Sequence, residues 1–374
     1  MTNLMIALCL FINIMQPEPE QKNIDEIYKI YKELSITDFS SDHGILKSDI
    51  HINFLDKVLN GKKPLANHYQ RLESGQPWLF FWTTTALSVL NYKLPFPAYI
   101  LAYLKEMYNE GFQGSTYQLA HVASTYAAIG CIVNIGTEEA FKLVDKKQMK
   151  SFLMKMKKTS VDEGSDMTKW NVSPKNAFEM HQNGEFDLRA LYCAVAVADI
   201  LGFANDADFK EGIGDFISSC QTYEGGISCI QLAEAHAGYT YCGLSALILL
   251  GELEKINKEK LIEWYVNRQT KEGGFNGRIN KRVDACYNFW VGSIGKLLGV
   301  DLISANGVRT YTLCCCQHAK GGFVDKPLKG NDLYHSCYAP SGLAYYHSEL
   351  IQMHPLFNMP ADKVEKAKKY FKSH

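Results

Sequence analysis

Apolar residues recur at helical spacing along most of the chain. Between residues 23 and 59, Ile24, Ile27, Tyr31 and Leu34 fall three or four positions apart, which is the spacing of one face of a helix. Similar amphipathic segments follow one another after residue 82, separated by short turns. The pattern predicts an all-α protein.

A turn of small residues, in most cases glycine, followed by a large apolar residue divides the helical segments into repeats. These anchor residues are Phe112, Phe178, Ile227, Phe275 and Phe323. The last three steps between them are 49, 48 and 48 residues, long enough for two helices and two connections, so each repeat is predicted to be a helical hairpin. The first step is 66 residues, and we interpret its surplus, the polar run 162–175, as a surface insertion.

About six such hairpins can stack as an open solenoid or close into an α/α toroid, with inner and outer rings of helices around a funnel-shaped cavity. Closure is favoured because unusual polar residues recur just before or at the start of the second helix of each repeat. They are Arg189, His236, Asp284, Cys286 and His335. If the second helices form the inner ring, these side chains meet at one end of the funnel, where helix N-termini favour an anion.

Composition adds few constraints. The chain has 374 residues and a formal net charge of -1, which gives no indication of nucleic-acid binding. The repeats favour one domain over residues 23–374, preceded by a leader at 1–22. The apolar run of this leader, residues 5–15, has no basic residue ahead of it, unlike a signal peptide, and its roughly eleven residues are too few to span a bilayer, so we expect a packed or disordered leader. Eleven cysteines without a disulfide-like spacing indicate a reducing compartment, by default the cytoplasm.

Asp284, Cys286 and His335 are candidate zinc ligands. A carboxylate, a thiolate and an imidazole from neighbouring repeats supply three protein ligands, which leaves a fourth position open, as in catalytic zinc sites. The alternative is that Cys286 is a buried core cysteine and Asp284 an N-cap. His335, at the matching place in its repeat, favours the metal.

His236, Arg278 and Lys281, with Tyr287 as a hydroxyl donor, could surround a diphosphate and stabilise the charge that develops as it leaves. The alternative for Lys281 alone is an ordinary exposed lysine. Large aromatic residues fall near the same helix ends and could line a cavity for an apolar chain, although core packing is the alternative for each of them. They are Trp78, Trp82, Tyr126, Tyr192, Tyr241, Trp290 and Tyr334. Together these residues point to a lipid diphosphate.

Long ordered motifs make residues 73–371 resemble the β subunits of protein prenyltransferases, more closely the farnesyltransferase type than the geranylgeranyl type. The motifs are P-W-L at 77–79, G-E-F-D-L-R at 184–189, E-A-H-A-G-Y-T-Y-C-G-L at 234–244, 273–290, G-G-F-V-D-K-P at 321–327 and D-L-Y-H-S-C-Y at 332–338. The resemblance implies an α/α toroid that acts only with a separate α subunit. It also implies farnesyl transfer from farnesyl diphosphate to the cysteine of CaaX-ending proteins such as small GTPases.

The resemblance also assigns residues. Asp284, Cys286 and His335 match the zinc ligands, and Asp325 matches a carboxylate associated with magnesium on the diphosphate. Trp78 and Tyr126 match the bulky residues that shorten the lipid pocket in the farnesyl type, and Asp325 stands where the type I geranylgeranyl enzyme has lysine. The remaining substrate contacts it implies are Trp82, Arg189, Tyr192, His236, Cys242, Arg278, Lys281, Tyr287, Trp290 and Tyr334.

Three alternatives remain at this stage. The nearest is a type I geranylgeranyltransferase β subunit or an enzyme that accepts both lipids. A terpene cyclase on a similar toroid would use a D-x-D-D cluster, which the sequence lacks. In a non-enzymatic helical-repeat scaffold, the zinc-like residues would only contribute to packing.

Overall fold

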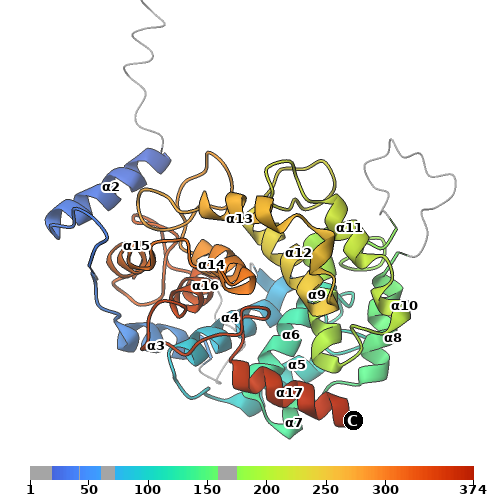
Figure 1. The fold of residues 1–374 in the computed structure, drawn as a ribbon. Coiled ribbons are helices and arrows are strands. Elements are labelled where there is room, and N and C mark those ends of the chain that lie inside the picture. The colour runs from blue at the N-terminus through green and yellow to red at the C-terminus, as the bar shows by residue number, and fades with distance from the viewer. Residues whose placement is uncertain (1–18, 42, 60–71, 159–174) are drawn as a thin grey trace, which may run out of the picture.

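The computed structural model describes residues 19–41, 43–59, 72–158 and 175–374. The predicted leader up to residue 18, and the predicted insertion up to residue 174, lie outside the described residues. The described chain is helical with isolated β-bridges in place of extended strands (Figure 1). The prediction of an all-α fold is confirmed.

Six helices form a closed inner ring (Figure 1). They are α4 (Gln76–Val89), α6 (Val122–Ile135), α9 (Leu188–Leu201), α12 (Ala237–Leu250), α14 (Tyr287–Leu298) and α16 (Leu333–Leu343). Each contacts the next, and α16 returns to contact α4. The predicted α/α toroid is therefore confirmed, and the contact between α16 and α4 excludes the open solenoid.

An outer layer of helices precedes the inner helices in sequence. It consists of α3 (Ser48–Asp56), α5 (Pro97–Glu106), α8 (Lys146–Met156), α11 (Ile213–Ser219), α13 (Lys258–Val266) and α15 (Ala305–Thr310), which continues as the π-helix η3 (Tyr311–Cys315). The inner helices are enclosed on nearly every side, which explains why α12 has hardly any strongly polar position.

Shorter or peripheral helices complete the fold. They are α2 (Pro19–Glu33), α7 (Glu138–Phe141), α10 (Ala207–Lys210), η2 (Leu253–Lys255) and α17 (Ala361–Ser373). The helical spacing predicted over residues 23–59 is divided between α2 and α3, with a non-helical connection between them.

The glycine of the repeated turn makes room for an aromatic side chain from the outer layer of the next repeat. A Cβ atom on these glycines would lie between 2.5 and 2.8 Å from that aromatic ring. The pairs are Gly111–Phe152, Gly226–Trp264, Gly274–Tyr311 and Gly322–Phe54. Because Phe54 lies on α3 in the first hairpin and Gly322 in the last repeat, the same contact closes the toroid.

A repeated glutamine reinforces this closure. In two repeats, the Oε1 atom accepts a hydrogen bond from the backbone N–H just before the next outer helix, at 2.8 Å; the pairs are Gln221–Asn257 and Gln269–Ser304. Gln317 makes the same bond to the N–H of Lys47 at 2.7 Å, just before α3. The first hairpin therefore takes the place of a seventh repeat.

The chain at the start of five of the six inner helices, α4, α6, α9, α12 and α14, is tied to the following repeat by a backbone hydrogen bond. The N–H group donates to the carbonyl oxygen two residues after the next anchor, at 2.7 to 3.1 Å. The donor–acceptor pairs are Gln76–Gly114, Val122–Met180, Leu188–Cys229, Ala237–Gly277 and Ala285–Asp325. Successive helix N-termini are thereby held together around one end of the toroid.

The C-terminal segment plugs the toroid from the other end. The hydroxyls of Tyr126 and Tyr192 donate to the carbonyl oxygens of Phe357 and Leu356, both at 2.7 Å, and α17 packs against α6, α7 and α9 (Figure 1). The open space therefore lies toward the starts of the inner helices.

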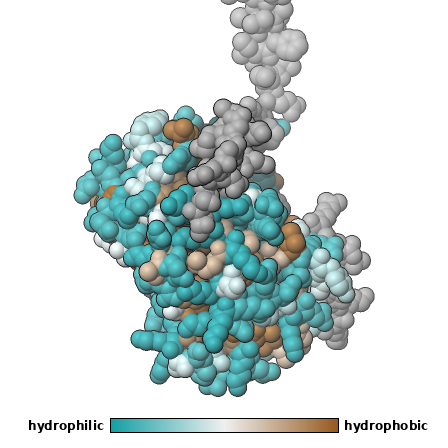
Figure 2. All heavy atoms as spheres, turned by 90° about the vertical axis from the view of Figure 1, so that its right-hand side faces the viewer, coloured by the Kyte–Doolittle hydropathy of each residue, from teal (hydrophilic) through white to brown (hydrophobic). Residues whose placement is uncertain are grey.

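The outer face of the toroid formed by α8, α10 and α11 is mostly polar (Figure 2). Figure 2 shows the side of α8, α10 and α11, where hydrophilic residues predominate and hydrophobic ones are confined to small patches. Among the described residues, no helix is both long and apolar enough to span a membrane.

Candidate active site

Polar side chains cap the starts of the inner helices. His121, Asp187, His236, Asp284 and Asp332 each accept a hydrogen bond from a backbone N–H two or three residues further on, at 2.7 to 3.2 Å. Asp284 makes this bond in the turn before α14, whose N-cap residue is Cys286, so the N-cap alternative for Asp284 is wrong. The hydrogen bond does not exclude a metal, because the same carboxylate also faces an imidazole and a thiol.

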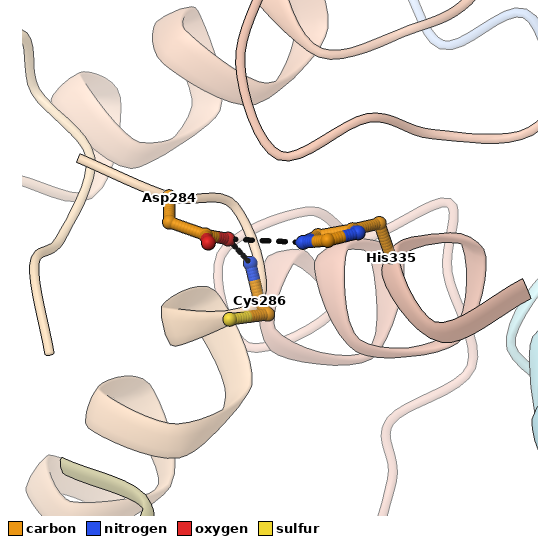
Figure 3. A group of neighbouring side chains, drawn as sticks. All are labelled: Asp284, Cys286 and His335. Atoms are coloured by element: carbon orange, nitrogen blue, oxygen red, sulfur yellow. Dashed lines mark hydrogen bonds and ion pairs between the residues drawn. The ribbon is translucent and has the colours of Figure 1, made fainter. Parts of the chain in front are cut away.

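Asp284, Cys286 and His335 lie together, with their potential ligand atoms within 4.8 Å of one another (Figure 3). Four-coordinate zinc, with ligand bonds of about 2.0–2.3 Å, places its ligand atoms roughly 3.5 Å apart. Small side-chain rotations would bring the three atoms to that spacing. Oxygen, sulfur and nitrogen donors together are a ligand set that zinc accepts, so the residues fit the metal.

Asp332 orients the imidazole of His335. Its Oδ2 atom lies 2.7 Å from Nδ1, which leaves Nε2 facing Asp284 Oδ1 at 3.2 Å. Metal-binding histidines commonly donate their second ring N–H to such a carboxylate. Burial alone would lower the pKa of His335, but the hydrogen bonds to Asp284 and Asp332 raise it to about 9.

The electrostatics of the other two residues favour a cation between them. Burial opposes the charged form of Asp284, but the hydrogen bond and charge of His335 lower its pKa to about 2. Burial, followed by the charge of Asp284, raises the pKa of the Cys286 thiol. A bound cation is therefore needed for this thiol to be a thiolate at neutral pH.

A second cluster surrounds His236. The imidazole Nε2 atom lies 3.0 Å from the hydroxyl of Tyr287, and Arg278 forms an ion pair with Glu234 at 2.5 Å. Gly277 makes this arrangement possible, because a Cβ atom there would lie 2.1 Å from the tyrosine ring. The cluster offers imidazole, hydroxyl and guanidinium donors at the starts of two inner helices, which suits an anion.

A cavity of about 840 Å³ opens beside these residues. Most of the substrate contacts predicted from the sequence line it: Trp78, Trp82, Tyr126, Arg189, Tyr192, His236, Cys242, Arg278, Tyr287, Trp290 and Tyr334. Its size is that of pockets that bury a medium-sized ligand, and its walls are mainly apolar and aromatic.

Lys281 and Asp325 are outside both the cavity lining and the candidate metal cluster. Lys281 is exposed on the loop after Arg278, and the carboxylate of Asp325 forms an ion pair with Lys326 at 2.7 Å. The roles predicted for these two side chains stay predictions.

The closed end of the cavity has a row of hydrogen-bonded tyrosines. The hydroxyl of Tyr192 lies 3.1 Å from those of Tyr126 and Tyr241, and the rings of Trp78 and Tyr126 lie 5.9 Å apart. Near the open end, Arg189 is held by Asp187 through Nε and Nη2. The cavity therefore has an aromatic floor and a charged mouth.

Several residues of this site were not predicted from the sequence. Asp332 was missed although its D-x-x-H spacing from His335, just before an inner helix, indicated a cap. Tyr239, Tyr338 and Asn358 also line the cavity. Asn358 comes from the C-terminal segment, outside the repeats, so the periodicity gave no indication of it.

The loops before the inner helices share a strained position. The fifth residue after each anchor has a positive φ of 58° to 66°; these are Tyr117, Asn183, Leu232, Asn280 and Leu328. A left-handed backbone costs an ordinary residue roughly 1–2 kcal/mol, and asparagine less. Tyr117, Leu232 and Leu328, which we call the rim residues, nevertheless expose 101%, 105% and 68% of their surface. Burial in the chain itself does not explain them.

Known proteins share this architecture and sequence. The chain is 31% identical over 390 residues to the protein farnesyltransferase subunit beta of Arabidopsis thaliana, covering 86% of this chain and 77% of that protein. It is 33% identical over 362 residues to that of Schizosaccharomyces pombe, covering 86% and 90%. The geranylgeranyl transferase type-1 subunit beta of Arabidopsis thaliana is 37% identical over 231 residues, covering 59% and 57%.

A solved structure has the same fold. The Candida albicans protein geranylgeranyltransferase-I complexed with GGPP superposes with a TM-score of 0.71 at 21% identity, covering 87% of this chain and 99% of that one. Residues 46–359 match the family described as the prenyltransferase alpha-alpha toroid domain. The chain therefore belongs to the prenyltransferase family of α/α toroids, as the β subunits of protein farnesyltransferases do.

Proposed function

We propose that this chain is the catalytic β subunit of a zinc-dependent protein farnesyltransferase, which transfers farnesyl from farnesyl diphosphate to the cysteine thiol of C-terminal CaaX motifs. The observation that carries the proposal is that a candidate metal cluster adjoins the lining of one aromatic cavity. His236, Arg278 and Tyr287 line the cavity, and the group of Asp284, Cys286 and His335 includes the residues directly before Tyr287 and directly after Tyr334, two further lining residues. The names of the relatives support the same reaction.

In this reaction, the acceptor sulfur forms a bond to the first carbon of the isoprenoid while the bond from that carbon to the diphosphate oxygen breaks. Zinc held by Asp284, Cys286 and His335 would keep the acceptor cysteine as a thiolate at neutral pH. His236, Arg278 and Tyr287 donate to the departing diphosphate, whose charge grows in the transition state. Lys281, on the same loop as Arg278, is proposed to move toward this charge when the diphosphate binds.

The aromatic cavity receives the isoprenoid. Trp78 and Tyr126 occupy its closed end, so one more isoprene unit would have to displace packed rings. This favours farnesyl. The second candidate is a type I geranylgeranyltransferase or an enzyme that uses both lipids, which the 37% identity to the geranylgeranyl relative supports.

Magnesium is the second proposed metal and would accompany the diphosphate. Asp325 is its proposed ligand on the basis of resemblance. The ion pair between Asp325 and Lys326 would have to open for this role. Magnesium bound through a single carboxylate and substrate phosphates is common.

The proposed partner is a prenyltransferase α subunit, and the rim residues are its proposed contacts. Exposed apolar side chains on strained loop tips are explained if a second chain covers them. A CaaX-ending protein would enter beside Arg189, Trp82 and Tyr334, which line the cavity near its mouth. The cytoplasm is the proposed location, because the cysteines of the described residues form no disulfide with one another.

The test is co-expression with an α subunit, followed by assays of CaaX peptides with farnesyl and geranylgeranyl diphosphate and by metal analysis. We expect one zinc per heterodimer, its loss in Cys286→Ala, and preferential farnesylation. Preference for the longer lipid would favour the second candidate. A heterodimer without zinc or transfer would refute the proposed function.

A further inference from the structure

Tyr311 is one of the aromatic residues that pack against a turn glycine, and its hydroxyl makes a hydrogen bond that the aromatic residues at the equivalent positions do not make. It packs against a turn glycine, as Phe152, Trp264 and Phe54 do in other repeats. The two phenylalanines have no polar side-chain atom, and Nε1 of Trp264 has no hydrogen-bond partner. The hydroxyl of Tyr311 donates to the backbone carbonyl of Asp325 at 2.7 Å.

The Asp325 carbonyl is also the acceptor that holds the start of the metal-bearing inner helix. It accepts the N–H of Ala285 at 2.9 Å, and Ala285 lies between Asp284 and Cys286 in the sequence. Ala285 is fully buried, so water does not compete for this bond. The thiol of Cys316 also lies 3.8 Å from the same oxygen. One carbonyl therefore fixes the peptide unit between two candidate metal ligands.

The local backbone is suited to this contact. The outer helix of this repeat ends in the π-helix η3, which begins at Tyr311. Single π-turns are rare in helices and are frequent at functional sites. The next residue, Thr312, accepts a hydrogen bond at 2.7 Å from Asn288 on α14, so η3 contacts α14 through Thr312 and the Asp325 carbonyl through Tyr311. Here the outer layer contributes polar contacts beneath the metal ligands.

We propose that Tyr311 is a positioning residue for the metal ligands. By holding the Asp325 carbonyl, it fixes the Ala285 peptide and so the directions in which Asp284 and Cys286 project. This inference rests on the proposed function in one respect, that the three residues bind zinc. Removing a supporting hydrogen bond behind a metal site weakens metal binding by about 10- to 100-fold. We expect that loss for Tyr311→Phe.

The test measures zinc affinity by competition with a chromophoric chelator, on the full chain co-expressed with a prenyltransferase α subunit. The absorption spectrum of the cobalt-substituted protein reports the geometry around Cys286. Tyr345→Phe is the matched control, because it removes a tyrosine hydroxyl that contacts Ser293 on α14 at 2.9 Å, away from the ligands. Asp325→Asn keeps the backbone carbonyl. We expect both controls to keep the affinity within about twofold and the cobalt spectrum unchanged.

The outcomes separate the two proposals. If the unaltered protein binds no zinc, the proposed function fails. If it binds zinc and Tyr311→Phe has the same affinity and cobalt spectrum, only the positioning role is overturned. An equal loss in Tyr345→Phe overturns it as well, because the effect would then be general. If Tyr311→Phe does not fold, Cys316→Ala is the second test, because it removes the weaker donor to the same carbonyl oxygen. We expect Cys316→Ala to lower the zinc affinity by about threefold. An unchanged zinc affinity would contradict the positioning role.

Discussion

His236 Nε2 and the Tyr287 hydroxyl meet at 3.0 Å beside the cavity, and the protonation of the imidazole follows from its other contact. Nδ1 accepts the N–H of Gly238 at 3.0 Å, so Nε2 carries the hydrogen in the neutral ring. Burial, and then the charge of Arg278, lowers the pKa of His236, so the ring is neutral near pH 7. The Nε2–H group therefore donates to the Tyr287 oxygen, which leaves the tyrosine O–H as the donor of this pair that is available to the proposed diphosphate.

Two substitutions separate the capping role of His236 from its donor role. In His236→Asn, the amide oxygen can still accept the N–H of Gly238, but the Nε2 donor is lost. We expect near-normal thermal stability and a fall of roughly 10²- to 10³-fold in kcat/KM for farnesyl diphosphate. His236→Ala should lose about 0.5–2 kcal/mol of stability in addition. Steady-state kinetics and thermal unfolding of both variants check this, and unaltered turnover in His236→Asn would contradict the donor role.

Asp332 can be tested without disturbing the helix that it caps. Asparagine caps as well as aspartate, so Asp332→Asn should retain the fold while removing the charge behind His335. We expect zinc affinity to fall by about tenfold or more in chelator competition. Asp187→Asn, which changes another capping aspartate that pairs with Arg189, should leave zinc affinity unchanged. Equal affinities in the two variants would show that Asp332 is only a cap.

Trp78 is predicted to limit the length of the isoprenoid. Its indole lies against Trp82 and Tyr126 at centroid distances of 5.7 and 5.9 Å. Trp78→Thr would open space at the closed end of the cavity and is expected to shift the ratio of geranylgeranyl to farnesyl transfer by at least about tenfold. The measurement is competition between the two diphosphates with one CaaX peptide. A ratio equal to that of the unaltered enzyme would refute this role of the indole.

Most of the fold could be predicted from the period of the sequence repeat. Anchors such as Phe275 and Phe323 are buried at the turn of each hairpin, and the second helix begins where the spacing predicted. Ring closure was favoured but not established by the period, because contacts between the first and last repeats join residues far apart in sequence. The contacts of Gln317 with Lys47, and of Gly322 with Phe54, are of this kind.

The candidate site was predictable where residue type and repeat position agreed, as for Asp284, Cys286 and His335. It was less predictable where the important group belongs to the backbone or lies outside the repeat. The Asp325 carbonyl accepts a hydrogen bond from the hydroxyl of Tyr311, and no sequence pattern predicts this contact. Asn358 enters the cavity from the C-terminal plug.

Stability is predicted to fall between pH 7 and pH 5 because of buried histidines. His51 stacks on Phe323 and pairs with Gln317 at 2.9 Å, and burial lowers its pKa below the ordinary 6.5. Burial lowers the pKa in the same way for three further residues: His121, His236 and His354. The unfolded chain takes up protons around and below pH 6.5, while these four folded histidines stay neutral to a lower pH. Their contribution to stability is therefore fully present above pH 6.5 and is lost below it.

The pH effect can be assigned to one residue. His51→Gln removes the titrating group and can keep a hydrogen bond to Gln317, so the decline in Tm from pH 7 to pH 5 should become shallower. His374→Gln, at the exposed C-terminal residue, is the control and should leave the slope unchanged. Parallel melting profiles for His51→Gln and the unaltered protein would contradict the assignment.

The rim residues are predicted to act in association with the partner chain and not in folding. Asparagine has the same positive φ at the equivalent positions 183 and 280, so Leu232→Asn should fit its loop and relieve strain worth about 1 kcal/mol. It should nevertheless weaken the proposed heterodimer by roughly tenfold or more, because an apolar contact is lost. Thermal unfolding of the single chain and the dissociation constant from sedimentation are the two measurements.

Leu302→Asn is the control variant. It alters a leucine that is 60% exposed but lies outside the rim residues, and it should leave the dissociation constant unchanged. If both variants associate as tightly as the unaltered chain, Leu232 does not contribute to the interface.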